Sequence, residues 1–324
     1  MRKRLIAVML SVILCTGMLT GCGNWQTDTE NETGKLDIVA TDFAPYDFSR
    51  RVAAGAANVT MLLAPGEEAH SYEPTPRDMI KIQNCDVFVY TGGESEEWVS
   101  DILEDLEADI MVIRLMDCVE LYEEETVEGM EAEEHDHDHS HDHEDEEEAE
   151  YDEHVWTAPA NAIKITQALG EAFERADPSY RSVYQENTES YVAQLRDLDQ
   201  AFWDVVDDAE RKTLIFGDRF PLRYFVEEYG LDYYAAFPGC ASDTEPSAKT
   251  VAFLIDKVKE EQIPVVFHTE LSNQQMADTI CEDTGAVKRE FHACHNVTKE
   301  QFEQGLGYLD FMWSNVEVLK EALN

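Results

Sequence analysis

Eight short runs rich in β-branched and aromatic residues recur along the sequence, and a segment long enough for a helix follows most of them. The runs are 37–41, 59–63, 86–91, 111–115, 213–217, 232–237, 264–269 and 286–291. Strands that alternate with helices favour parallel sheets wrapped by helices, because a parallel connection must cross from one end of the sheet to the other. The pattern therefore predicts an α/β fold.

The runs fall into two groups of four, and about 290 residues follow residue 34, which is more than one compact core usually holds. We therefore expect two lobes, over 35–177 and 213–324, each a small and mostly parallel sheet wrapped by helices. The stretch 178–212 has no Gly, and no Pro after its first residue. We predict that it is one long, rigid helix joining the lobes, because its large apolar residues recur at helical spacing: Tyr184, Tyr191, Leu195, Leu198, Phe202 and Val205.

The N-terminus has the pattern of a secretory signal, in which Arg2-Lys3-Arg4 precedes an apolar run of roughly 15 residues. That run is shorter than the about 20 residues that a membrane-spanning helix needs. Leu19-Thr20-Gly21-Cys22 resembles the lipobox of bacterial lipoproteins, in which the cysteine is acylated. We expect a signal peptide over 1–21, a lipid on Cys22, a flexible tether over 22–34, and an extracytoplasmic protein that is lipid-anchored to the bacterial cell membrane.

The chain is strongly acidic. Its formal net charge of −45 becomes −48 once residues 1–21, which carry three cations and no acids, are removed. Such a surface repels nucleic acid and anionic lipid headgroups and concentrates cations. Nucleic acid is therefore not an expected partner.

One segment breaks the regular alternation of strands and helices. Residues 131–150 read EAEEHDHDHSHDHEDEEEAE and hold five of the ten histidines and twelve acids. This composition cannot bury a core, so we expect a disordered loop, bounded by 123 and 152, inserted in the first lobe. The loop could collect metal ions weakly and pass them on, or it could be an inert solvated insertion. The candidate residues for metal collection are His135, His137, His139, His141 and His143.

Five cysteines remain if Cys15 is lost with the signal and Cys22 is acylated: Cys85, Cys118, Cys240, Cys281 and Cys294. An oxidising exterior permits disulfides, but an odd number leaves at least one thiol. No Cys-x-x-Cys spacing indicates a thiolate metal site. Cys240 and Cys294 both follow predicted strands, so they are the first pair that we expect to be bonded.

Five histidines lie outside the acidic loop and are candidates for a metal site. In parallel α/β lobes, ligands bind beyond the carboxyl ends of the strands, and in a two-lobe protein these ends can face one another. His154 precedes a helix that is predicted to begin near Pro159. The other four lie at or just beyond the ends of predicted strands: His70, His268, His292 and His295.

The surroundings of two of these histidines suit a preorganised ligand. Pro74 and Pro76 stiffen the segment after His70, and Thr75 can cap the helix that follows. A Val-Trp pair after His154 can anchor its turn in the core. Neutral imidazole is the commonest transition-metal ligand, although each histidine taken alone could equally have no binding role.

The sequence resembles the metal-specific ABC-transporter solute-binding proteins of the zinc/manganese class over about 36–324. The resemblance is carried by AHSYEPTPRD at 69–78, by the His-rich acidic insertion, by HVW at 154–156 with PANA at 159–162, and by FHTE at 267–270 with TGA at 284–286. It implies two lobes joined by a backbone helix, with a single metal held between them. His70 and His154 match the two ligands that this family takes from the first lobe.

The second lobe departs from the family pattern. The position that usually carries a His or Glu ligand is Gly217, which has no side chain to coordinate a metal. Asp218 could substitute for it, or it could instead pair with Arg219 or cap the next helix. His292 and His295 follow the last predicted strand and are three residues apart, so both could face the cleft.

A tetrahedral zinc ion would then be held by His70, His154 and His295, with His292, Asp218 or water in the fourth position. Glu270 is expected to accept a hydrogen bond from a ligand imidazole and so to orient it. Imidazole-rich sites suit zinc, whereas manganese prefers more carboxylate oxygen, so zinc is favoured and manganese is the alternative.

The sequence and the resemblance together predict capture of a divalent transition metal outside the cytoplasm and its delivery to the permease of an ABC importer, by a monomer that is not an enzyme. A surface metal buffer or adhesin is one alternative, since the importer's other components are separate chains. A zinc hydrolase is another, but the chain has no His-Glu-x-x-His, Gly-x-Ser-x-Gly or phosphate-binding Gly-Lys-Ser/Thr motif.

Overall fold

The computed structural model describes residues 34–105, 110–130, 150–241 and 247–324. The predicted signal peptide 1–21, Cys22 and the tether up to residue 33 lie outside the described residues, as do the five histidines of the acidic loop. In the part of the chain that the structure describes, no helix is long and apolar enough to cross a membrane.

The first half contains one parallel sheet in the strand order β2-β1-β3-β4. Its strands and the helices that follow them are β1 (Leu36–Ala40), α2 (Phe43–Ala53), β2 (Ala57–Met61), α3 (Pro76–Asn84), β3 (Val87–Tyr90), α4 (Trp98–Asp105) and β4 (Met111–Arg114). The central strands β1 and β3 are almost wholly buried, which explains their near-continuous apolar sequence. All four strands overlap the runs expected from the sequence.

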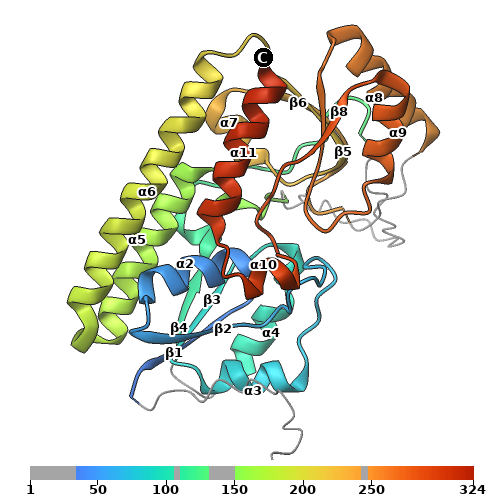
Figure 1. Ribbon diagram of the computed structural model, residues 1–324. Helices are drawn as coiled ribbons and strands as arrows, with labels where there is room; N and C mark the ends of the chain where they lie inside the picture. The colour runs from blue at the N-terminus through green and yellow to red at the C-terminus, as the bar shows by residue number, and fades with distance from the viewer. Residues whose placement is uncertain (1–33, 106–109, 131–149, 242–246) are drawn as a thin grey trace, which may run out of the picture. The chain divides into compact units, whose positions relative to one another are not determined.

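A second parallel sheet in the order β6-β5-β7-β8 occupies the other half (Figure 1). Its elements are β5 (Thr213–Phe220), α7 (Arg223–Tyr229), β6 (Asp232–Pro238), α8 (Ala248–Glu261), β7 (Val265–His268), α9 (Gln275–Thr284) and β8 (Val287–Glu290). The predicted α/β fold with two parallel sheets wrapped by helices is therefore confirmed.

Two long helices, α5 (Pro159–Ala176) and α6 (Arg181–Asp207), separate the two sheets in sequence. Helix α6 packs against α2 and α5 and also against α7 and α11 (Tyr308–Leu323), so it contacts elements of both halves. Its buried face consists of the residues that recur at helical spacing, among them Tyr184, Leu195 and Phe202. The predicted long joining helix is confirmed. Four short 3-10 helices complete the order: Glu94–Glu96, Leu115–Cys118, Val155–Thr157 and Pro178–Tyr180.

The chain returns to the first half after β8. The segment from Phe291 to Gly307 carries the short helix α10 (Lys299–Glu303), which Figure 1 shows beside α2. The backbone N–H of Phe43 donates to the carbonyl of His295, at 3.3 Å. Tyr308 N donates to the buried carboxylate of Asp47 at 2.9 Å, so α11 is held to α2. Consequently the largest apolar core joins residues of both halves, and the sequence did not predict this return.

Two further sequence expectations concern the loop and the cysteines. Within the predicted loop 123–152, the described ends are paired, since Glu123 and Tyr151 form an antiparallel bridge. Cys240 and Cys294 are not bonded to each other, and the prediction of that disulfide is wrong. The five cysteines among the described residues are all free thiols.

Candidate metal centre

His70 lies in the segment between β2 and α3. Thr75 caps α3, and its hydroxyl and the carboxylate of Asp78 form a reciprocal capping box, with Pro76 at the first helical position. Asn296 reaches this segment from the C-terminal part of the chain, and its Nδ2 donates to the carbonyls of Ala64 (2.9 Å) and Glu67 (2.8 Å). The loop that carries His70 is therefore fixed at both ends.

His154 is completely buried at the turn before α5. The same carboxylate oxygen of Asp152 accepts a hydrogen bond from the backbone N–H of His154 (2.8 Å) and lies 3.1 Å from its Nδ1. Because Nδ1 is held in this way, Nε2 is the free ring nitrogen, and it has no partner among the described residues. A carboxylate behind an imidazole is the usual arrangement that fixes a metal-binding histidine.

His295 comes from the segment that returns to the first half. The two carboxylate oxygens of Glu270, just after β7, accept hydrogen bonds from the backbone N–H groups of Ala293 (2.7 Å) and His295 (2.9 Å). Trp156 Nε1 donates to the carbonyl of Ala293 at 2.8 Å. The turn that carries His295 is thus tied to the turn that carries His154.

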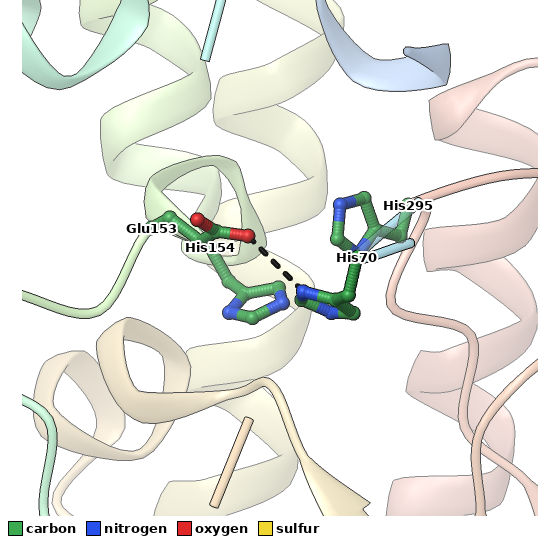
Figure 2. A group of neighbouring side chains, drawn as sticks. All are labelled: His70, Glu153, His154 and His295. Atoms are coloured by element: carbon green, nitrogen blue, oxygen red, sulfur yellow. Dashed lines mark ion pairs between the residues drawn. The ribbon is translucent and has the colours of Figure 1, made fainter. Parts of the chain in front are cut away.

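The three imidazoles converge. Ligand atoms of His70, His154, His295 and Glu153 all lie within 4.8 Å of one another (Figure 2). The ring centroids are 5.4 Å apart for His70 and His154, 4.7 Å for His70 and His295, and 5.0 Å for His154 and His295. Such a cluster of nitrogen and oxygen ligands is of the type that zinc prefers.

Glu153 is the member of this group that the sequence did not reveal. Its Oε1 lies 3.3 Å from Nδ1 of His70 and accepts a hydrogen bond from the hydroxyl of Ser95 at 2.7 Å. Its side chain is buried. In the sequence it follows a long acidic run, which hides it among carboxylates; its position next to His154 was the available signal.

The members of the group differ in their electrostatics, and the surroundings favour a neutral imidazole at His295 but not at His154. Burial and the neighbouring charges of His70, His154 and Arg219 hold the pKa of His295 well below its ordinary value. Burial alone would lower the pKa of His154 too, but the charge and hydrogen bond of Asp152 outweigh it, so that pKa is raised. Burial would raise the pKa of Glu153, yet contacts with the two neighbouring imidazoles and Ser95 hold it below its ordinary value, which keeps this carboxylate ionised.

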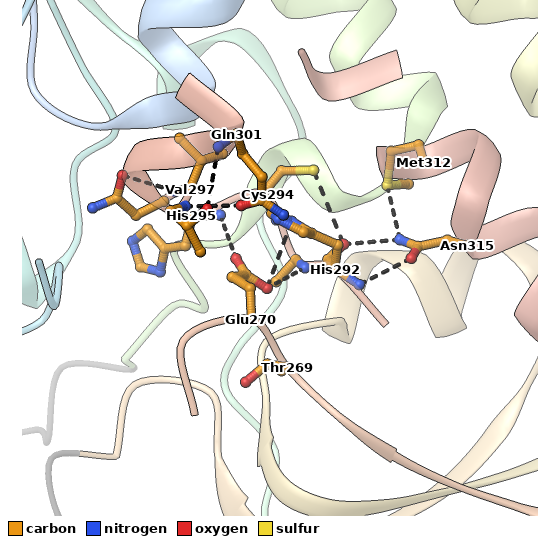
Figure 3. Close-up of polar contacts among 12 residues, drawn as sticks. Thr269, Glu270, His292, Cys294, His295, Val297, Gln301, Met312 and Asn315 are labelled. Carbon is orange, nitrogen blue, oxygen red and sulfur yellow. Dashed lines mark hydrogen bonds and ion pairs between the residues drawn. The ribbon is translucent and has the colours of Figure 1, made fainter. Parts of the chain in front are cut away.

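His292 and Asp218 lie outside this group. The ring of His292 stacks on Phe311 with centroids 3.9 Å apart. Its Nδ1 accepts a hydrogen bond from the N–H of Cys294 (Figure 3). Asp218 lines the same cavity as His70, but its Oδ2 accepts hydrogen bonds from the N–H (2.9 Å) and the hydroxyl (3.0 Å) of Thr269. Both residues are therefore engaged in local structure.

Glu270 and His268 also have local partners. Glu270 holds the backbone of the His295 turn instead of receiving a hydrogen bond from that imidazole, although it lies 3.7 Å from Nδ1 of His292. The Nδ1 of His268 lies 2.9 Å from the carbonyl of Thr269. Glu270 thus acts on a ligand histidine through the backbone.

A close approach of two elements accounts for Gly217. A Cβ atom at this position would lie 2.7 Å from Cα of Ala277, in the first turn of α9. Any larger side chain there would push α9 away from β5. Glycine thus lets α9 pack closely on the strand, and it does so at the expense of a side-chain ligand.

The sequence is similar to a known family of proteins. The family model described as "Zinc-uptake complex component A periplasmic" (ZnuA) matches residues 38–322. The chain belongs to this family. The predicted resemblance is thereby confirmed.

Two relatives of the ZnuA family are similar along almost all of this chain. The high-affinity zinc uptake system protein ZnuA of Bacillus subtilis (strain 168) is 31% identical over 315 residues, which is 96% of this chain and 96% of that protein. The zinc-binding lipoprotein AdcA of Streptococcus pneumoniae is 31% identical over 321 residues, 97% of this chain. The chain spans 60% of the length of AdcA.

Solved structures agree with the fold. The Zn(II)-bound ZnuA-like domain of Streptococcus pneumoniae AdcA matches with a TM-score of 0.73 and 28% identity over 90% of this chain and 99% of that one. The metal-dependent lipoprotein YcdH of Bacillus subtilis matches with a TM-score of 0.74 and 28% identity over 90% of this chain and 100% of that one. The two-lobed architecture is therefore that of the ZnuA family.

Proposed function

We propose that this chain captures zinc outside the cytoplasm and delivers it to the permease of an ABC importer. The observation that carries the proposal is the convergence of His70, His154 and His295 on one point, from three segments far apart in sequence. Unpaired, buried imidazole nitrogens are unfavourable without a ligand, so a metal ion is the natural occupant. The names of the relatives, a zinc uptake protein and a zinc-binding lipoprotein, support this choice.

The composition of the ligand set favours zinc over manganese. Three imidazoles and at most one carboxylate make a nitrogen-rich site, whereas manganese prefers more oxygen ligands. In the proposed site, His70, His154 and His295 coordinate the ion directly. Glu153 is either the fourth ligand or the carboxylate that orients His70.

The remaining parts of the proposal concern location and accessory residues. A signal peptide over 1–21 and a lipid on Cys22 would tether the chain, as a monomer, to the outer face of the cell membrane. The acidic loop with its five histidines would collect zinc weakly and raise its concentration near the site.

The domain bounds 35–177, 178–212 and 213–324 are retained as a working division. We do not assign an enzymatic activity, since the members of the ZnuA family named above are transport and binding proteins.

A zinc titration of the mature chain without 131–150 tests the proposal. We expect one tightly bound zinc per chain, measured by competition with a chromophoric chelator and by metal analysis, because the converging histidines lie outside the deleted loop. The parent chain with its loop intact is the matched control and should bind additional, weaker zinc. A deleted chain that retains no tight site would overturn the proposal in favour of a loop-driven surface buffer.

A further inference from the structure

A large cavity adjoins the three converging imidazoles. Its volume is about 620 Å³, and its wall includes His70, His154, His295 and the start of α9. A single metal ion fills a small fraction of such a space, whereas cavities of about 300–1,000 Å³ typically hold small organic ligands. The space beside the proposed zinc position is therefore sized for a further molecule.

The protein ligands leave one coordination position for that molecule. Glu153 is occupied, because its two oxygens accept hydrogen bonds from the hydroxyl (2.7 Å) and the backbone N–H (3.3 Å) of Ser95, and Oε1 also lies against Nδ1 of His70. This places Glu153 behind an imidazole, in an orienting role. Three imidazoles then hold the zinc, and zinc bound by three protein ligands keeps a fourth position open to another donor.

The cavity wall has buried hydrogen-bond acceptors that already have partners and buried donor groups that have none. Its buried acceptors are engaged: Asp218 by Thr269, and Glu270 by the backbone of the His295 turn. Apart from the imidazoles, two polar groups of the wall are buried and have no hydrogen-bond partner among the described residues, namely Nε of Arg219 and the hydroxyl of Ser272. Arg219 does pair through Nη1 with the exposed carboxylate of Glu68 at the rim, at 2.9 Å.

The start of α9 adds backbone N–H groups to this wall. The helix spans Gln275–Thr284, and its N-cap residue Gln274, at φ 59°, provides no side-chain cap. Asn273 satisfies the first N–H, that of Gln275. The remaining first-turn N–H groups carry the partial positive charge of a helix N-terminus, which favours an anionic group. The fully buried Nε2 of His154, also without a partner among the described residues, belongs to the same cavity wall.

We propose that the chain binds its metal as a complex with a small carboxylate-bearing chelator. One donor of the chelator takes the fourth coordination position, and a second carboxylate lies against Arg219, Ser272 and the first turn of α9. A guanidinium is the side chain best shaped to receive a carboxylate, and carboxylate oxygen is a normal zinc ligand. This inference rests on the proposed function, since it names the form in which the captured zinc is bound.

Citrate is a suitable probe for the test. The mature chain is equilibrated at fixed free-zinc concentrations with and without citrate, and radiolabelled citrate is followed by equilibrium dialysis. We expect one citrate per zinc-loaded chain, none on metal-free chain, and an about tenfold lower Kd for zinc when citrate is present, because the two ligands are thermodynamically coupled. The chain without 131–150 should behave in the same way, which separates this site from zinc citrate held by the loop.

Substitutions in the cavity wall test where the second carboxylate of the chelator lies. The quantity compared is the zinc Kd without citrate divided by the zinc Kd with citrate. Arg219→Gln and Ser272→Ala should each reduce this ratio, and in Arg219→Gln it should approach one. Arg289→Gln is the matched control, because Arg289 pairs with Glu321 outside the cavity wall, and its ratio should equal that of the parent chain. An unchanged ratio in both Arg219→Gln and Ser272→Ala would overturn the proposed position of the carboxylate.

The experiment distinguishes failure of the chelator proposal from failure of the proposed function. Tight zinc binding with no retained citrate and no change in the zinc Kd would overturn the chelator and leave the proposed function standing. Loss of tight zinc binding in every condition would overturn the proposed function itself. If inorganic phosphate were to reproduce the coupling and citrate were not, the cavity would be a general anion site, and the carboxylate assignment would be wrong.

Discussion

The two halves of the molecule contribute to the metal centre in different ways. The first half supplies His70 and His154, and a buried carboxylate lies against the ring of each: Glu153 beside His70 and Asp152 beside His154. The C-terminal part supplies His295, whose ring forms no ion pair with a carboxylate among the described residues. Its backbone, not its ring, is held by Glu270.

In the proposed site, the first half would therefore present imidazoles already oriented by carboxylates, whereas the C-terminal part would contribute an imidazole positioned by its backbone turn. Orientation of an imidazole by a carboxylate fixes its tautomer and increases its basicity. The comparison therefore predicts that changes on the first-half side act through ring chemistry, and that changes on the other side act through the geometry of the turn.

The largest effect is expected from His154→Ala. Loss of a fully buried ligand should weaken zinc binding by more than the about 10–100-fold that is typical of removing an orienting partner. His292→Gln is the matched control, because His292 lies outside the converging group, and its zinc Kd should remain near that of the parent chain. Competition titrations measure both. Equal losses in the two variants would mean that His292 belongs to the ligand set, contrary to its place outside the converging group.

A smaller effect is expected from removing the carboxylates that support the ligands. Asp152→Asn should weaken zinc binding by about 10–100-fold, since it removes the charge that orients the ring of His154. Glu270→Gln keeps one carbonyl acceptor for the turn that carries His295, so its effect should be smaller than that of Asp152→Asn. A larger loss in Glu270→Gln would reverse the comparison between the two halves. Circular dichroism of both variants controls for unfolding.

The pH dependence should be the most gradual effect. The raised pKa of His154 means that zinc must displace a proton at pH values above the ordinary range of histidine, near 6.5. Zinc affinity should therefore fall by about tenfold per pH unit as the pH drops through that raised pKa. His295, with its lowered pKa, adds no proton in this window.

Asp152→Asn sharpens this prediction, since it removes the largest cause that raises the pKa of His154. The fall in zinc affinity should then begin at a lower pH than in the parent chain. The folding stability of the metal-free protein should depend on pH in the opposite direction to its zinc affinity. The raised pKa of His154 stabilises the fold at pH values below the ordinary pKa, and this contribution is lost as the pH rises through the raised value. Identical pH profiles for the variant and the parent would contradict the assigned pairing.

Local sequence patterns predicted much of the fold. Period and composition marked all eight strands, the cap at Thr75 and the start of α5 at Pro159, because these features depend on neighbouring residues alone. The return of the chain from β8 to α2 could not be predicted, since it depends on contacts between distant residues such as Asp47 and Tyr308. The pairing of Cys240 with Cys294 failed for the same reason.

The site was predicted in part. His70, His154 and His295 were all named from the sequence, and the structure brings them together. Whether His292 lies beside His295 needed the backbone, because Cys294 between them adopts a left-handed conformation, with φ 62°, and the ring of His292 stacks on Phe311. Glu153 was missed because an acidic run gives no sign of which carboxylate is buried.

The sharpest test of a zinc site built from both halves is a crystal structure of the zinc-loaded chain, with anomalous diffraction recorded at the zinc absorption edge. We expect one strong anomalous peak at about 2.0–2.1 Å from a ring nitrogen of each of His70, His154 and His295. A peak coordinated only by residues of one half, or no ordered peak near these three histidines, would contradict it.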